Sequence, residues 1–226
     1  MLFLIKSINV INMQKYEIIN KLIKHFKYKS YLEIGLDNPN NNFTKVNCEL
    51  KESVDPYFKE DHRNGWDCML SEDIKKEIDK YLTYKMTSDE FFANNTKKYD
   101  IILIDGLHTK EQVGKDIINS LKCLNKNGKI IVHDCLPPNE ERQIVPRRQG
   151  PWNGDVWRTI PELKKQNIRY YTVDTDEGCA IIDFKTSSKK LKYIESWDNT
   201  WEDFKKHKNE LMNVIKVKDF DKLILI

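Results

Sequence analysis

The sequence predicts an α/β fold with a parallel, doubly wound sheet, and three features of the chain indicate it. Continuously apolar runs at 100–104 and 129–132 are typical of buried parallel strands. A helix-length amphipathic segment separates them, as the crossover between parallel strands requires. Each run ends in a cluster of acidic and histidine residues, and ligands bind at the carboxyl ends of strands in such sheets.

The length and composition are those of an ordinary globular protein. We expect a single domain over residues 1–226, in which 1–27 and 186–226 are N-terminal and C-terminal helical extensions. A formal net charge of +3 on balanced acids and bases does not favour a nucleic-acid partner. No apolar run is long enough for a membrane helix, so no membrane partner is expected.

The N-terminus and the cysteines favour a cytoplasmic location. The apolar start of the chain is interrupted by Lys6 and has no small-residue cleavage site after it, so a signal peptide is not expected. The five cysteines are odd in number and widely spaced, which indicates reduced thiols rather than a disulfide framework or a zinc site.

Periodicity and capping residues place the elements of the first half of the chain. Ser71 and the capping chemistry from Thr87 to Glu90 mark two helix starts. In order, we predict a helix over 13–26, a strand over 30–35, a strand over 52–56, a loop over 57–67, a helix over 71–82, a brief strand over 84–86 and a helix that starts near 87.

The second half continues the same alternation. Asn127 and Gly128 are expected to end the crossover helix as a glycine cap does. In order, we predict a strand over 100–104, a helix over 109–124, a strand over 129–132, a long loop over 136–154, a helix over 155–166, strands over 168–173 and 179–184, and a polar helix over 197–214.

The ends of the first two strands are suited to a nucleotide-like ligand. Gly35 allows the backbone to turn sharply where a ligand approaches, although a simple turn after the strand explains it equally well. Asp55, at the tip of the second strand, is placed to hold a ribose diol, or it forms an Asp-Pro turn.

Asp105 and His108 form the candidate catalytic pair. They lie three residues apart where a strand turns into a helix, so both side chains can face one crevice. The imidazole can take a proton from a hydroxyl near neutral pH, which makes His108 a candidate general base. The alternative is a histidine at a helix start that only binds the backbone.

Asp105 and Asp134 follow adjacent strands and could together hold a divalent cation. His133 stands beside Asp134, and an imidazole there weakens the case for Mg²⁺ or favours a softer ion. Without a metal, Asp105 is expected to orient His108 or to bind a cofactor amine.

The loop from 137 to 157 is a candidate substrate loop. Its arginines can bind phosphate or carboxylate and its tryptophans can stack on sugar rings, or the loop is merely solvated and the tryptophans close the core. The residues concerned are Arg142, Arg147, Arg148, Trp152 and Trp157, with Asp155 expected to cap the next helix. The aromatic residues Trp197, Trp201 and Phe204 predict a packing face or a homodimer surface.

Several motifs together resemble class I S-adenosylmethionine-dependent methyltransferases. They are Y-L-E-I-G, V-D-P, M-T-S-D-E-F-F, Y-D-I-I-L-I-D-G-L-H, the run L-N-K-N-G-K-I-I-V-H-D-C-L-P-P, and W-N-G-D-V-W, and they span roughly residues 31–184. The resemblance is greatest to the branch found with polysaccharide and glycan biosynthesis. It implies a Rossmann-like, seven-stranded, doubly wound sheet that is mostly parallel with an antiparallel last strand and has helices on both faces.

The resemblance also implies positions for the cofactor. Glu33 and Gly35 would lie near the methionine part of S-adenosyl-L-methionine, Asp55 at the ribose, and Ser88 and Asp89 near the adenine. Asp105, if it holds no metal, would bind the methionine amine. The carboxylates Asp105 and Asp134 are similar to the Mg²⁺ ligands of metal-dependent catechol and macrolide-sugar O-methyltransferases.

These observations favour a cytoplasmic O-methyltransferase whose acceptor is a sugar, a nucleotide-sugar or another small hydroxylated molecule. One alternative is a phenolic or nitrogen acceptor. Another is a methyltransferase-like fold that binds a nucleotide or a protein partner without turnover, motivated by the Asn-rich segment after Gly35. A nucleotide-binding oxidoreductase would need G-x-G-x-x-G after the first strand, and this pattern is absent.

Overall fold

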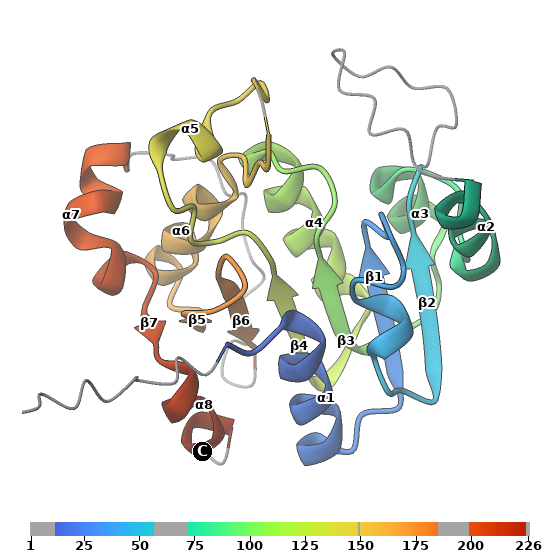
Figure 1. The fold of residues 1–226 in the computed structure, drawn as a ribbon. Helices are drawn as coiled ribbons and strands as arrows, with labels where there is room; N and C mark the ends of the chain where they lie inside the picture. The colour runs from blue at the N-terminus through green and yellow to red at the C-terminus, as the bar shows by residue number, and fades with distance from the viewer. Residues whose placement is uncertain (1–11, 57–71, 149, 185–198, 225–226) are drawn as a thin grey trace, which may run out of the picture.

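The computed structural model describes residues 12–56, 72–148, 150–184 and 199–224. A seven-stranded sheet runs through the molecule in the order β2-β1-β3-β4-β6-β5-β7 (Figure 1). The strands are β1 (Ser30–Ile34), β2 (Leu50–Val54), β3 (Tyr99–Ile104), β4 (Leu124–Val132), β5 (Arg169–Val173), β6 (Cys179–Asp183) and β7 (Val214–Ile215).

The sheet is mixed, as the resemblance implied. Strands β1 to β4 pair in parallel, whereas β6 is antiparallel to both β4 and β5. The two-residue strand β7 pairs in parallel with β5 and was not predicted. The predicted fold class is therefore confirmed, with β6 as the antiparallel strand.

Helices cover both faces of this sheet. On one face lie α3 (Ser88–Asn94), α4 (Lys110–Lys122), α6 (Thr159–Lys165) and α7 (Trp201–Leu211). On the other lie α1 (Lys15–Phe26), α2 (Glu72–Tyr81) and α8 (Val217–Ile224). Short turns complete the fold at α5 (Glu140–Gln143) and at the 3₁₀ segments η1 (Phe43–Lys45) and η3 (Val156–Arg158).

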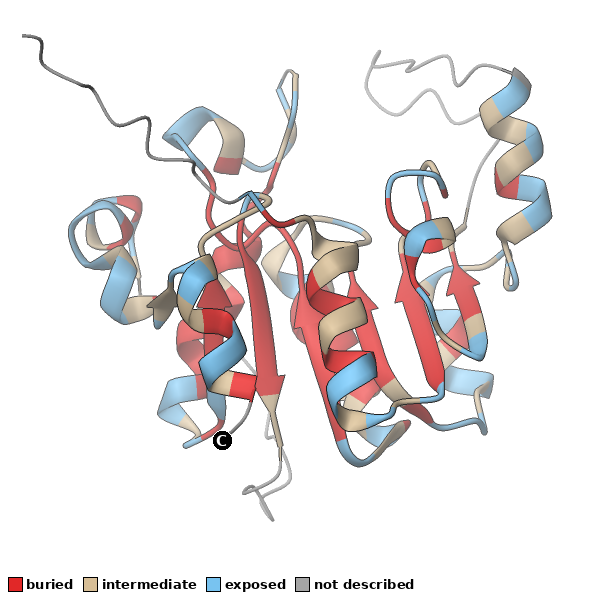
Figure 2. Cartoon of the chain, turned by 60° about the horizontal axis from the view of Figure 1, so that its bottom comes forward, coloured by how far each residue is buried: buried red, intermediate tan, exposed pale blue. Residues whose placement is uncertain are grey.

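The apolar core is divided into two layers by the sheet, which is buried along most of its length (Figure 2). Side chains alternate between the faces of a strand, so Ile102 and Ile104 pack with α4 while Ile101 and Leu103 pack with α1. This double coverage explains why β3 reads as a continuous apolar run instead of an alternating one.

Several predicted boundaries were wrong. Asn127 and Gly128 do not cap the crossover helix, which ends at Lys122, but lie within β4. The left-handed Asn127 (φ 65°) produces the register shift between β3 and β4 instead. The brief strand at 84–86 is a single bridge from Tyr84 to Val54.

At the C-terminus, the helix predicted over 197–214 is shorter, because α7 ends at Leu211 and β7 follows it. Ser71, Trp197 and the loop predicted over 57–67 lie outside the described residues. Within the part of the chain that is described, no helix has the length and apolarity to cross a bilayer.

Candidate functional site

Four sequence-predicted side chains meet at the carboxyl edge of β3 and β4. Asp105 follows β3, His108 lies in the turn before α4, and His133 and Asp134 follow β4. His108 Nε2 lies 3.5 Å from Asp105 Oδ1, and its Nδ1 lies 3.2 Å from Asp134 Oδ2. His133 Nδ1 lies 3.1 Å from the same oxygen of Asp105. The structure thus brings these four residues together as expected from adjacent parallel strands.

Two glycines allow the backbone to approach this cluster. Gly35 has φ +90°, and a Cβ there would lie 2.2 Å from the carbonyl oxygen of Asp105. Gly154 has φ +61°, and a Cβ there would lie 1.7 Å from the carbonyl oxygen of His108. Only glycine fits either position without a shift of the chain. The end of β1 and the loop before η3 therefore close on the site from two sides.

Lys15 supplies a cation that the sequence analysis missed. Its Nζ lies 2.6 Å from Asp105 Oδ2, and both side chains are largely buried. Burial lowers the pKa of Lys15, but the carboxylates of Asp105, Asp176 and Glu33 together raise it above its ordinary value, so the ammonium stays charged. Burial likewise raises the pKa of Asp105, yet the charges of His133 and Lys15 hold it well below its usual range.

His133 is buried among three carboxylates. Besides Asp105, it approaches Asp134 Oδ1 at 3.5 Å through Nδ1 and Asp176 Oδ2 at 3.7 Å through Nε2. Burial lowers the pKa of His133, but Asp105 and Asp134 raise it well above its ordinary value. Asp176, in the turn between β5 and β6, had no signal in the sequence.

The loop that precedes η3 covers His108. The ring of Trp152 stacks on the imidazole at 5.5 Å between centroids, and the Trp152 carbonyl lies 2.9 Å from His108 Nδ1. Asn153, which is fully buried, donates to Asp134 Oδ1 at 2.7 Å. A proton on Nδ1 satisfies the carbonyl and leaves Nε2 as the basic nitrogen of the neutral ring.

The pKa of His108 is set by opposing effects. Burial lowers it, whereas the hydrogen bond to Asp105 and the charge of Asp134 raise it, and the pKa ends above its ordinary value. The two nitrogens of the ring are held in different surroundings, Nε2 beside Asp105 and Nδ1 beside Asp134 and the Trp152 carbonyl.

The residues predicted to bind a cofactor lie along the ends of β1 and β2. Glu33 is buried and its Oε2 accepts hydrogen bonds from the Tyr31 hydroxyl (2.5 Å) and from Asn42 Nδ2 (2.8 Å). Burial raises the pKa of Glu33 to about 7. Asp55 Oδ2 accepts the backbone N–H of Leu36 at 2.9 Å, which fixes the turn after Gly35.

Ser88 and Asp89 open helix α3, further along the same edge. Gln112 Nε2 on α4 lies 3.1 Å from both Ser88 Oγ and Asp89 Oδ1, and 3.1 Å from Asp116 Oδ1. Asp116 is buried, which raises its pKa to about 6. These contacts join α3 to α4 beside the strand ends.

The arginines of the predicted substrate loop have different roles in the fold. Arg142 binds Glu177 and donates from Nε to Asn153 Oδ1 at 2.9 Å. Arg147 donates to the carbonyl of Gly150 at 2.7 Å. Arg148 is exposed. Arg142 thus ties the loop to the β5–β6 turn. The guanidinium of Arg148 has no assigned partner among the described residues.

In this loop one expectation was wrong, that for Asp155, and for Trp157 the structure supports the alternative that the tryptophans close the core. Asp155 does not cap the following helix through its side chain, because Oδ1 accepts the backbone N–H of Lys110 at 2.8 Å and so holds the start of α4. Trp157 is fully buried and packs on Phe204, with ring centroids 4.6 Å apart, and is not available to stack on a sugar. Trp201 joins the same cluster, so the predicted packing role of these C-terminal aromatics is confirmed.

The donor atoms around Asp105 do not suit a hard cation such as Mg²⁺. Asp105, His108 and Asp134 can each place one ligand atom within 4.8 Å of the others. However, the ammonium of Lys15 and the ring of His133 already contact the two oxygens of Asp105, and the ammonium charge there opposes a metal ion. In this arrangement Lys15 has the neutralising role that a metal would have.

Comparison with known proteins agrees with the fold. Residues 37–135 match a family model described as a methyltransferase domain. The structure is similar to a candidate O-methyltransferase from Klebsiella pneumoniae, with 11% identity, a TM-score of 0.50, and coverage of 74% of this chain and 78% of that one. It is equally similar to the O-methyltransferase TomG from Streptomyces achromogenes, involved in tomaymycin synthesis and solved with SAM, at 10% identity, TM-score 0.50 and coverage of 74% and 78%.

None of the curated proteins matches the sequence. At these identities the solved structures show the fold, which is the Rossmann-like fold of methyltransferases. Residues 37–135 are therefore similar to a methyltransferase domain in sequence as well as in fold.

Proposed function

We propose that the protein is an S-adenosylmethionine-dependent O-methyltransferase that acts on a sugar, a nucleotide-sugar or another small hydroxylated acceptor. The observation that carries the proposal is the position of His108, whose Nε2 lies 3.5 Å from Asp105 at the carboxyl edge of the sheet. A basic nitrogen held between two carboxylates is what deprotonation of an acceptor hydroxyl requires. The match over residues 37–135 and the TomG fold support methyl transfer as the reaction.

The cofactor would lie along the ends of β1 and β2. Gly35 lets the chain turn closely against the main chain of Asp105, Asp55 would bind the ribose, and Ser88 and Asp89 would lie near the adenine. Glu33 would lie near the methionine end of the cofactor without binding it through Oε2, because this oxygen already accepts hydrogen bonds from Tyr31 and Asn42.

When bound, the cofactor supplies an activated methyl group on a sulfonium. The protein's part is to hold the acceptor oxygen in line and to take its proton. His108 Nε2 accepts that proton as the oxygen gains the methyl group, and the charges of Asp105 and Asp134 stabilise the resulting imidazolium. Asp105 orients His108 in this scheme, with Lys15 as its counter-charge.

The acceptor would enter beneath the loop that carries Trp152. This ring stacks on His108 and is partly exposed, so it would limit the acceptor's approach to Nε2. Arg148, which is exposed, would bind charged groups of the acceptor, as in a nucleotide-sugar. A carbohydrate acceptor, a cytoplasmic location and a homodimer all belong to this proposal.

Calorimetric titration with S-adenosylmethionine measures whether the protein binds this cofactor. Methyl transfer from labelled cofactor to a panel of sugars, nucleotide-sugars, phenols and amines identifies the acceptor. We expect micromolar cofactor binding and turnover of a hydroxylated sugar that persists with EDTA. No binding at millimolar cofactor would leave a non-catalytic binding fold. Turnover of phenols or amines alone would overturn the sugar acceptor, and loss of activity with EDTA that added Mg²⁺ reverses would indicate a metal ion at Asp105 and Asp134.

A further inference from the structure

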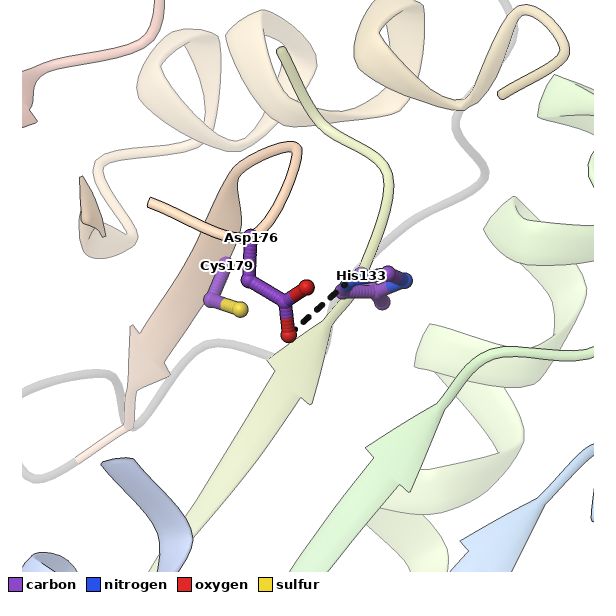
Figure 3. A group of neighbouring side chains, drawn as sticks. All are labelled: His133, Asp176 and Cys179. Atoms are coloured by element: carbon purple, nitrogen blue, oxygen red, sulfur yellow. Dashed lines mark ion pairs between the residues drawn. The ribbon is translucent and has the colours of Figure 1, made fainter. Parts of the chain in front are cut away.

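A second cluster of potential ligand atoms lies on the other side of His133. It comprises His133 at the end of β4, Asp176 in the β5–β6 turn and Cys179 at the start of β6 (Figure 3). One nitrogen, one oxygen and one sulfur, one from each residue, all lie within 4.8 Å of one another. His133 and Cys179 are buried, and Asp176 is intermediate in exposure. The group adjoins the proposed catalytic pair, because His133 also contacts Asp105, but it includes neither Asp105 nor His108.

The sheet register explains why residues so far apart in sequence meet here. In the antiparallel pairing of β4 and β6, Val132 lies opposite Ala180. The next residues towards the edge are therefore His133 on one strand and Cys179 on the other. The backbone N–H of Cys135 bonds to the carbonyl of Gly178 at 3.0 Å, which continues this pairing beyond the strands.

The imidazole of His133 is arranged as a metal ligand usually is. Its Nδ1 lies 3.1 Å from Asp105 Oδ1, whereas the buried Nε2 has no hydrogen-bond partner among the described residues and faces Asp176 Oδ2 at 3.7 Å. Metal-binding histidines typically donate one ring N–H to a carboxylate and use the other nitrogen as ligand. A buried ring nitrogen without a hydrogen bond otherwise costs free energy.

We propose that His133 Nε2, the Asp176 carboxylate and Cys179 Sγ bind one divalent transition-metal ion of the zinc type. Imidazole nitrogen, thiolate sulfur and carboxylate oxygen together select zinc and similar borderline ions over Mg²⁺ or Ca²⁺. Three protein ligands leave a fourth position for water. Asp105 is the carboxylate that orients the histidine.

One of the three ligands, Asp176, is reached from a cavity. Asp176 also lines a cavity of about 500 Å³ between the β5–β6 turn and α7, which Thr175, Gly178, Trp201 and Lys205 help to line. On binding, the thiol of Cys179 and any proton on His133 Nε2 are released to solvent. The bound ion would fasten the β5–β6 turn to the end of β4.

Cobalt binding tests the proposal on the full chain, without the methyl donor. After treatment with a chelator, Co²⁺ is added and the near-ultraviolet charge-transfer absorption of a cobalt–thiolate bond is followed. We expect one equivalent of Co²⁺ per chain, displaced by Zn²⁺, and an upward shift of Tm with either ion. Mg²⁺ should compete with neither.

Cys179→Ser should abolish the thiolate absorption and weaken Zn²⁺ binding at least tenfold, and Asp176→Asn should weaken it with the absorption retained. The matched control is Cys135→Ser, because Cys135 is also buried but its Sγ faces the carbonyl of Val132 at 3.3 Å. This variant should bind like the wild type. Zn²⁺ affinity that survives in Cys179→Ser, or a cobalt spectrum without thiolate absorption, would overturn the site. Either result leaves the methyltransferase proposal unaffected, since it is measured without cofactor or acceptor.

Discussion

The ammonium of Lys15 on α1 lies 2.6 Å from a carboxylate oxygen of Asp105, although ninety residues separate them. This pair joins the first helix to the end of the central strand β3. Because its two charges are mostly shielded from water, it links the stability of α1 to the electrostatics of the candidate site.

Removal of the Lys15 charge should therefore cost stability. We expect Lys15→Met to lower the free energy of unfolding by about 2 to 3 kcal/mol, because Asp105 loses one of its two counter-charges. Urea denaturation measures the change. Lys21→Met on the same helix is the control, since its ion pair with Asp221 is exposed and should contribute less than about 1 kcal/mol. Equal losses in both variants would contradict a special role of Lys15.

His108 should be needed for turnover and not for cofactor binding. His108→Gln can keep the hydrogen bond to the Trp152 carbonyl but has no basic nitrogen. We expect kcat to fall by roughly 10²- to 10⁴-fold while Kd for S-adenosylmethionine changes less than about threefold. His25→Gln, at an exposed position near the end of α1, serves as the control. An unchanged kcat would rule out His108 as the base.

Gly154 should tolerate no side chain. A Cβ would lie 1.7 Å from the His108 carbonyl oxygen, so Gly154→Ala must displace the loop. We expect a loss of about 2 kcal/mol or more in the free energy of unfolding, together with lower turnover. The matched variant is Gly150→Ala, which has a similar φ (+48°) but no atom within 4 Å of its Cβ. It should lose about 1 kcal/mol, which thermal unfolding can separate from the larger effect.

Of the two loop tryptophans, Trp157 should contribute to stability and Trp152 to turnover. Trp157 is completely buried, so Trp157→Ala should lower the free energy of unfolding by about 3 to 5 kcal/mol by leaving a cavity. Trp152→Ala should cost less than about 1.5 kcal/mol and should mainly lower turnover, because this ring stacks on His108. Chemical denaturation and steady-state kinetics on both variants distinguish the roles. The reverse order of stabilities would refute this assignment.

Glu33 should make the fold less stable as the pH rises. Burial raises the pKa of Glu33 to about 7 from about 4.5 in an unfolded chain. Between these values the folded state keeps a proton that the unfolded state releases, so raising the pH lowers stability by about 3 kcal/mol across the window. Glu33→Gln keeps an oxygen for Tyr31 and Asn42 but does not ionise, so this loss should vanish. Urea denaturation at pH 5 and pH 8 measures it, with the exposed Glu49→Gln expected to behave as the wild type.

The parallel half of the sheet and the residues at its edge could be predicted from local patterns. β3 is covered on both faces and therefore reads as an unbroken apolar run, and the run stops where Asp105 reaches the edge. His108 was predictable for the same reason, because only three residues separate it from the strand. Short-range spacing carries this information without knowledge of the rest of the fold.

Contacts that depend on long-range register could not be predicted this way. Lys15 reaches Asp105 only because α1 packs across β3, and nothing near Lys15 in sequence indicates it. Cys179 was interpreted as a plain reduced thiol, since its neighbours Asp176 and His133 are defined only by the pairing of β4 with β6. At Asn127 and Gly128 a glycine cap was predicted, but the left-handed residue is Asn127, and pairing with β3 makes both residues part of a strand instead of a helix end.

The reversed direction of β6 has a practical consequence. Its first residue lies at the rim where its parallel neighbours finish, so a short hairpin of residues 174–178 delivers functional groups there without any crossover helix. Replacing this hairpin with hairpins of other lengths or sequences would change the surroundings of His133, while the order and direction of the parallel strands stay the same.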